Sequence, residues 1–144
     1  MGAEYGNGKW WSSLIQSYDD MKRTLKGQGL EQNHLVHAMF FRNGPPETRH
    51  LVSEVPCLTL SVEEHRGAKT SFHHMKDGTV IGRGEQSFAG CGMDGYLVGR
   101  GIRMKGPFTR AEIVSAIDAS ADYWKMIRME HCAEALAEFK QRFF

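Results

Sequence analysis

Residues 109–144 read TRAEIVSAIDASADYWKMIRMEHCAEALAEFKQRFF, and this C-terminal stretch decides the fold class. Thr109 and Glu112 fit a capping box, in which each side chain satisfies a backbone amide at the start of a helix. Apolar residues then recur at intervals of four and three in two stripes, and the second stripe is offset by two residues. The two stripes are Ile113, Ile117, Trp124 and Ile127, followed by Met129, Cys132, Leu136, Phe139 and Phe143.

The offset between the stripes bears on the continuity of this helix. A shift of two residues turns a helix face by roughly 200°. The helix therefore either breaks between about Asp118 and Asp122, or its two halves pack against different partners. In both cases we expect a long C-terminal helix, continuous or broken, that packs on the preceding part of the domain.

Residues 34–104 have the character of short strands. Within Cys57–His65, Leu58, Leu60 and Val62 alternate with polar residues, which is typical of a strand with one buried face. Asp77-Gly78, between two strand-like runs, predicts a tight hairpin. Further strand-like runs cover residues 49–55, 70–76, 79–84 and 96–104, whereas 34–41 fits either a strand or a helix. We expect an antiparallel sheet of about six short strands, interrupted at Asn43-Gly44-Pro45-Pro46, at Pro56 and at Gly106-Pro107.

The N-terminal part predicts a helix over residues 11–26, with apolar side chains at helical spacing. Ser12 or Ser13 fits its N-cap, and Gly27 or Gly29 fits its C-cap. Residues 1–10 are rich in glycine and polar side chains, and we interpret them as a flexible arm. The expected fold is one α+β domain over residues 11–144, in which an N-terminal helix and a long C-terminal helix pack on the sheet.

Composition excludes several classes of protein. The 144 residues carry a net charge of +1, so no overall field directs the chain toward nucleic acid or a membrane surface. Its three cysteines are odd in number and widely spaced, which predicts reduced thiols in the cytoplasm and no disulfide framework. No stretch fits a signal peptide or a membrane span, and no motif calls for a cofactor.

One pattern occurs twice. Asp77–Gly84 and Asp94–Gly101 share Asp-Gly, one variable residue, two aliphatic residues and Gly-Arg-Gly. We interpret the copies as two similar hairpins or turns that lead into strands with bulges at glycine. The pattern resembles the glycine-rich hairpin units of MORN repeats, but two shortened copies assign no family.

Catalytic and metal-binding signatures are weak. His34 and His37 form a His-x-x-His pair, and His73 and His74 are adjacent, but no carboxylate motif accompanies them, so we expect no metal site. Cys91 lies between glycines, where a nearby His73 or His74 is needed to activate its thiol. The sequence does not show whether these residues converge, and we expect a protein without enzymatic activity.

The expected function is that of a non-catalytic binding protein that acts through a partner surface, as an inhibitor, immunity protein or accessory factor does. A basic strand face and the tryptophans at the end of the arm are the candidate contacts with another protein, which would carry an acidic surface. The candidate residues are Arg83, Arg100, Arg103 and Lys105 on the strands, with Trp10 and Trp11 beside the arm.

Two alternatives stay open. The first is a cup for a small ligand or a substrate, with an apolar pocket between the sheet and the C-terminal helix. The second is a nucleic-acid-binding protein that uses the same basic strand face. A large pocket with converging histidines or acids would favour the cup, whereas a filled core with an exposed apolar or basic patch would favour partner binding.

Deleting residues 1–9 tests the interpretation of the arm. Polar, glycine-rich terminal residues contribute little to stability, so the melting temperature should stay nearly unchanged. Thermal unfolding followed by circular dichroism measures this directly. A large drop in melting temperature would show that the arm docks on the domain.

Overall fold

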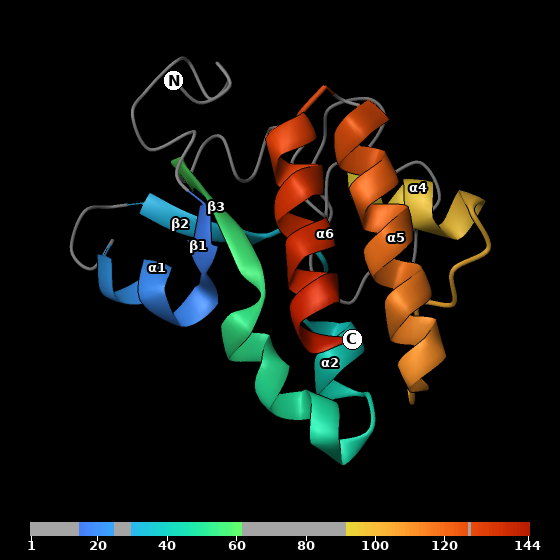
Figure 1. Cartoon of the computed structure of the whole chain (residues 1–144). Coiled ribbons are helices and arrows are strands. Elements are labelled where there is room, and N and C mark those ends of the chain that lie inside the picture. Colours follow the sequence, from blue (N-terminus) through green and yellow to red (C-terminus); the bar gives the residue numbers. More distant parts are fainter. Residues whose placement is uncertain (1–14, 25–29, 62–91, 127) are drawn as a thin grey trace.

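The computed structural model describes residues 15–24, 30–61, 92–126 and 128–144 (Figure 1). A small sheet lies on one side of two long antiparallel helices, and a shorter helix flanks them on the other side. In chain order the elements are β1 (Ile15–Ser17), α1 (Tyr18–Thr24), β2 (Leu30–His34), α2 (Met39–Arg42), the 3₁₀ helix η3 (Pro46–Glu54), β3 (Pro56–Ser61), α4 (Gly92–Gly99), α5 (Arg110–Met126) and α6 (Glu130–Phe143).

The sheet contains three antiparallel strands in the order β1-β3-β2 within the described residues. Cys57 of β3 pairs with Gln16 of β1 on one side and with His34 of β2 on the other. Pro56 is the first residue of this central strand, where a missing amide is tolerated, and its carbonyl oxygen accepts a hydrogen bond of 2.9 Å from the Leu35 amide. The strand predicted within Cys57–His65 is confirmed as far as Ser61.

The predicted sheet of about six strands is wrong. Residues 46–54, which include all but the last residue of the expected strand 49–55, form η3, in which Thr48 and Leu51 are buried one 3₁₀ turn apart. Pro46 starts this helix, because its fixed φ angle suits the first helical turn. The expected strands over 70–76 and 79–84, with the hairpin at Asp77, lie outside the described residues.

The expected strand over residues 96–104 is helix α4 followed by a turn. Met93 and Leu97, one helical turn apart, are fully buried, so their packing overrides the glycine-rich composition of this segment. Gly101 has a φ angle of +81° and ends the helix in a Schellman motif, with the Ile102 amide bonded to the Leu97 carbonyl oxygen at 3.0 Å. The hairpin interpretation, and with it the resemblance to MORN units, is therefore wrong for Asp94–Gly101.

The N-terminal helix begins later than predicted. Residues 15–17 form the edge strand β1, because pairing with β3 prevails over the helical periodicity of this segment. Ser17 then caps α1, since its side-chain oxygen accepts a hydrogen bond of 3.3 Å from the Asp20 amide. The proposed caps Ser12 and Ser13 lie outside the described residues.

The C-terminal helix is broken, but not between Asp118 and Asp122. Helix α5 continues to Met126, and α6 begins at Glu130 after a sharp turn. Arg128 has a φ angle of 65°, and the Met129 amide bonds the Trp124 carbonyl oxygen at 2.8 Å, so this turn is a second Schellman motif. Because of the turn, α5 and α6 lie side by side as an antiparallel hairpin (Figure 1).

The capping box predicted at the start of α5 is confirmed. The Thr109 amide donates to Glu112 Oε1 at 2.9 Å, and the Glu112 amide donates to Thr109 Oγ1 at 3.1 Å. Apolar side chains of α5 and α6 bury a shared core against β3, α2 and α4, with Trp124, Phe40, Phe41 and Leu136 at its centre. In the part of the chain that the structure describes, no helix has the length and apolarity needed to cross a membrane.

Gly44 and Gly99 offer a matched test of this packing. A Cβ atom at Gly44 would lie 2.7 Å from Ile113 Cδ1 and from Thr48 Oγ1, whereas a Cβ atom at Gly99 would meet nothing within 4 Å. Gly44→Ala should therefore lower the free energy of unfolding by about 1–3 kcal/mol. Gly99→Ala should leave it unchanged or raise it by up to about 1 kcal/mol, because alanine favours the helix. Urea denaturation measures both changes, and equal effects of the two substitutions would contradict the packing at Gly44.

Candidate functional site

The described members of the predicted basic face, Arg100, Arg103 and Lys105, do not lie on a strand. Arg100 lies at the end of α4, where its guanidinium pairs with Asp122 of α5 at 3.1 Å and donates to the Tyr96 hydroxyl at 2.5 Å. Lys105 is exposed in the loop before α5. Arg83, Trp10 and Trp11 lie outside the described residues, so their role in partner binding stays a prediction.

Arg103 holds the loop that precedes α5. Its guanidinium contacts both carboxylate oxygens of Glu112 at 2.9 Å and donates to the carbonyl oxygens of Lys105 and Pro107. It also lies over the Phe108 ring, 5.3 Å from the ring centroid. The hydrogen bond from the Thr109 amide lowers the pKa of Glu112, and the hydrogen bond from Arg103 has the next largest effect. The described acids that pair with Arg100 and Arg103 thus both lie on α5.

The described histidines that raised the question of a metal site serve different local structures. His34 stacks on Tyr18 with 4.8 Å between ring centroids, and His37 Nδ1 accepts a hydrogen bond of 3.2 Å from the Met39 amide at the start of α2. Over the described ranges, no three potential metal ligands of the His, Cys, Asp or Glu type gather at one point. His73, His74 and Cys91 lie outside those ranges.

The thiols of the two described cysteines have low reactivity. Cys57 in β3 and Cys132 in α6 are buried and neither forms a disulfide, which agrees with the predicted reduced state of these two thiols. Burial raises the pKa of both thiols, so little of the reactive thiolate forms near neutral pH. Neither side chain is therefore suited to act as a nucleophile.

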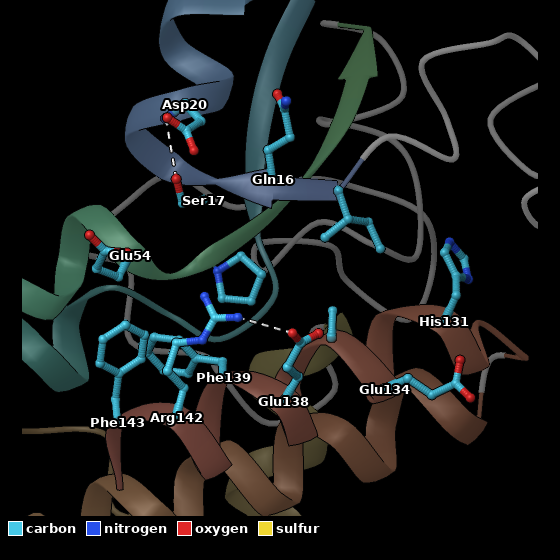
Figure 2. Close-up of a pocket in the computed structure, with 13 residues that line it drawn as sticks. Gln16, Ser17, Asp20, Glu54, His131, Glu134, Glu138, Phe139, Arg142 and Phe143 are labelled. Atoms are coloured by element: carbon cyan, nitrogen blue, oxygen red, sulfur yellow. Dashed lines mark hydrogen bonds and ion pairs between the residues drawn. The ribbon is translucent and has the colours of Figure 1, made fainter.

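A groove between the sheet and α6 is one feature that could receive a partner (Figure 2). One wall is formed by β1, by the first turn of α1 and by the junction of η3 with β3, and the other wall is one face of α6. The groove has a volume of about 610 Å³. We name it the β1–α6 groove. Its lining residues are Ile15, Gln16, Ser17, Asp20, Glu54, Pro56, His131, Glu134, Ala135, Glu138, Phe139, Arg142 and Phe143.

Carboxylates dominate the charge of the β1–α6 groove. Asp20 and Glu54 lie on the sheet wall, and Glu134 and Glu138 lie on α6. Arg142 is the one arginine or lysine in the lining, and it pairs with Glu138 at 3.1 Å. Asp20 pairs with an arginine of its own helix, whereas the described residues provide no ion pair for Glu54 or Glu134. The groove therefore has a net negative charge with two carboxylates left to neutralise.

The lining of the β1–α6 groove is otherwise largely apolar. The partly exposed Ile15, Ala135 and Phe143 contribute apolar surface to the lining. His131 lies at one end of the groove and is partly buried (Figure 2). Burial lowers the pKa of His131, an effect that the nearby charge of Glu134 opposes. The imidazole is thus mainly neutral near pH 7 and does not offset the acidic charge.

The sequence contains part of the signal for this groove. Positions 131, 134, 138 and 142 follow the three- and four-residue spacing of one helix face, so their common location on α6 follows from periodicity. The opposite wall depends on the pairing of β1 with β3, because this pairing brings Asp20 and Glu54 to the same edge. That long-range contact has no signature in the sequence.

The core contains a buried acidic side chain, that of Asp94. Asp94 is fully buried on α4, and burial raises the pKa of its carboxyl to about 7. Tyr123 of α5 is also buried, and burial, with a smaller effect from Asp94, raises its pKa to about 12. The residue that the sequence assigned to a hairpin turn is thus a carboxylic acid of the core that titrates near neutral pH.

Comparison with known proteins identifies no relative. No family model matches the chain, and no curated protein or solved structure is significantly similar to it. The chemistry of the groove is therefore the guide to function.

Asp94 gives a testable dependence of stability on pH. Its pKa is about 7 in the folded protein and 3.8 in an ordinary setting, so the folded state retains a proton that the unfolded state has lost between these values. Stability from this group is complete below about pH 4 and decreases as pH rises to about 7, by up to about 1.4 kcal/mol per pH unit. Asp94→Asn should remove this decrease, as measured by urea denaturation from pH 4 to pH 8.

The exposed Asp19 of α1 provides the control for this experiment, because Asp19→Asn should keep the pH dependence of the wild type. If the Asp94→Asn variant and the wild-type protein have parallel stability profiles, Asp94 does not titrate in this range.

Proposed function

We propose that the protein is a non-catalytic binding protein that receives a positively charged segment of a partner protein in the β1–α6 groove. The observation that carries this proposal is the pair of carboxylates, Glu54 and Glu134, that face the groove from its two walls without an ion pair in the described structure. A ligand with amino or guanidino groups would neutralise them.

The combination of charge and apolar surface favours lysine- or arginine-containing peptide. These side chains carry long aliphatic stems that pack on apolar surface while the charged end reaches a carboxylate. The partly exposed Ile15, Ala135 and Phe143 supply such surface in the same groove as the acids. Opposite charges also speed the encounter of two proteins and exclude partners with the same charge.

The groove offers little for catalysis. Ser17, the hydroxyl-bearing residue of its lining, already accepts the capping hydrogen bond of α1. Cys132 adjoins His131, with 3.8 Å between its sulfur and His131 Nε2, but burial raises the pKa of this thiol. These features support recognition over reaction.

The charge of the β1–α6 groove favours a basic partner, whereas the sequence predicted an acidic one. Arg100 and Arg103 already contact Asp122 and Glu112, which weakens the case for an acidic partner or a nucleic acid at these residues. The small-ligand cup is the remaining alternative, because about 610 Å³ lies within the usual range of small-molecule sites. The absence of a disulfide at Cys57 and Cys132 supports the cytoplasm as the compartment of this proposed function.

The double variant Glu54→Gln with Glu134→Gln tests the proposal. The probe is an acetylated hexapeptide of alternating lysine and leucine, titrated into the full chain and followed by amide chemical shifts in NMR spectra. Removing two carboxylates should raise the Kd for this peptide by about three- to tenfold, because each exposed charge pair contributes about 0.2–1 kcal/mol. Shifts should concentrate at β1 and α6.

A matched double variant, Glu47→Gln with Glu130→Gln, removes two exposed carboxylates outside the groove and should bind the peptide as the wild type does. A peptide of alternating glutamate and leucine should not bind. The proposal fails if the groove variant and the control variant bind the basic peptide equally. Binding of butylammonium as tight as that of the peptide would instead establish the small-ligand cup.

A further inference from the structure

Helices α5 and α6 border a second groove, which is distinct from the one beside the sheet. It lies between the two helices, has a volume of about 610 Å³ and contains three alanines in its lining. We name it the α5–α6 groove. Its lining residues are Ile117, Asp118, Ala121, Asp122, Lys125, Ala133, Glu134, Ala137, Lys140, Gln141 and Phe144.

An ion pair fixes the alignment of the two helices along this groove. Lys140 Nζ of α6 lies 2.9 Å from Asp118 Oδ1 of α5, so these positions are level. The helices are antiparallel. Ala121, three residues after Asp118 on α5, therefore lies level with Ala137, three residues before Lys140 on α6. The two alanines mark the middle of the groove.

Charged residues flank this middle on both helices, and Asp122, next to Ala121, already pairs with Arg100 at 3.1 Å. On α5, Asp118 precedes Ala121 by three residues and Lys125 follows it by four. On α6, Glu134 precedes Ala137 by three residues and Lys140 follows it by three. Each helix thus carries a negative charge on one side of its central alanine and a positive charge on the other.

This pattern is self-complementary under a two-fold rotation. If the axis runs across both helices through Ala121 and Ala137, each helix meets the same helix of a second copy in antiparallel orientation. Asp118 of each copy then faces Lys125 of the other, and Glu134 faces Lys140. We propose that the α5–α6 groove is a homodimer interface in which a second copy of this chain packs its own α5–α6 hairpin.

The uncharged lining fits helix-on-helix packing. Small side chains at the centre allow the helices of two copies to approach closely, because the alanines leave room for the ridges of the facing helix. Phe144, which is partly exposed, supplies a larger apolar group beside them. The surface combines an apolar middle with charged ends, as is usual for a protein interface.

Two charge reversals that complement each other test the dimer. Lys125→Glu brings glutamate against Asp118 of the second copy, and Asp118→Lys brings lysine against Lys125. Each variant alone should dimerise at least about tenfold more weakly than the wild type, because both copies then carry like charges at these contacts. Mixed in equal amounts, the two variants should form a heterodimer with wild-type affinity. Sedimentation velocity over a concentration series measures all four samples.

Ala137→Arg is the second variant, because Ala137 is exposed and a large side chain there should leave the fold intact while it blocks the centre of the interface. Glu47→Lys, on η3, is the control and should dimerise as the wild type does. A wild-type chain that stays monomeric, or charge-reversal variants that dimerise unchanged, would overturn the proposal. Asp118 and Lys125 do not line the β1–α6 groove, so this failure would leave the proposed function standing.

Discussion

The indole of Trp124 donates a hydrogen bond of 2.7 Å to the carbonyl oxygen of Leu35, and both residues are fully buried. A tryptophan in a core needs such an acceptor, and a buried carbonyl needs a donor. Leu35 in turn donates its amide to Pro56 at the start of the central strand. The bond therefore couples the helical hairpin to the sheet, and it fixes where α6 passes β1 and β3. The width and lining of the β1–α6 groove depend on this placement.

Local signals predicted local structure well. The capping box of Thr109 and Glu112 and the break at Asn43-Gly44-Pro45-Pro46 need only neighbouring residues, and both are present as expected. The segment after Gly92 shows the limit, because its glycines and aliphatic residues fit a strand and a helix almost equally. Burial of Met93 and Leu97 against the other helices decides between them, and this contact is not visible in the sequence.

For the candidate sites too, the sequence predicted what neighbouring residues determine and missed what long-range contacts determine. Periodicity places the acids of α6 on one face, but Arg100 and Arg103, two of the predicted basic contacts, pair with acids of the same domain in the structure. Arg103 spans the loop before α5 and binds Glu112, so its charge serves the fold. The carboxylates that keep their charge available lie where strand and helix meet, and only the three-dimensional arrangement brings them together.

Glu134 lines both grooves. If a second copy on one flank of α6 and a cationic segment on the other both draw on this carboxylate, the two equilibria are thermodynamically linked. If dimerisation changes the affinity for the segment by some factor, binding of the segment changes the dimerisation constant by the same factor. A single side chain between two surfaces would then make the oligomeric state respond to the concentration of the ligand.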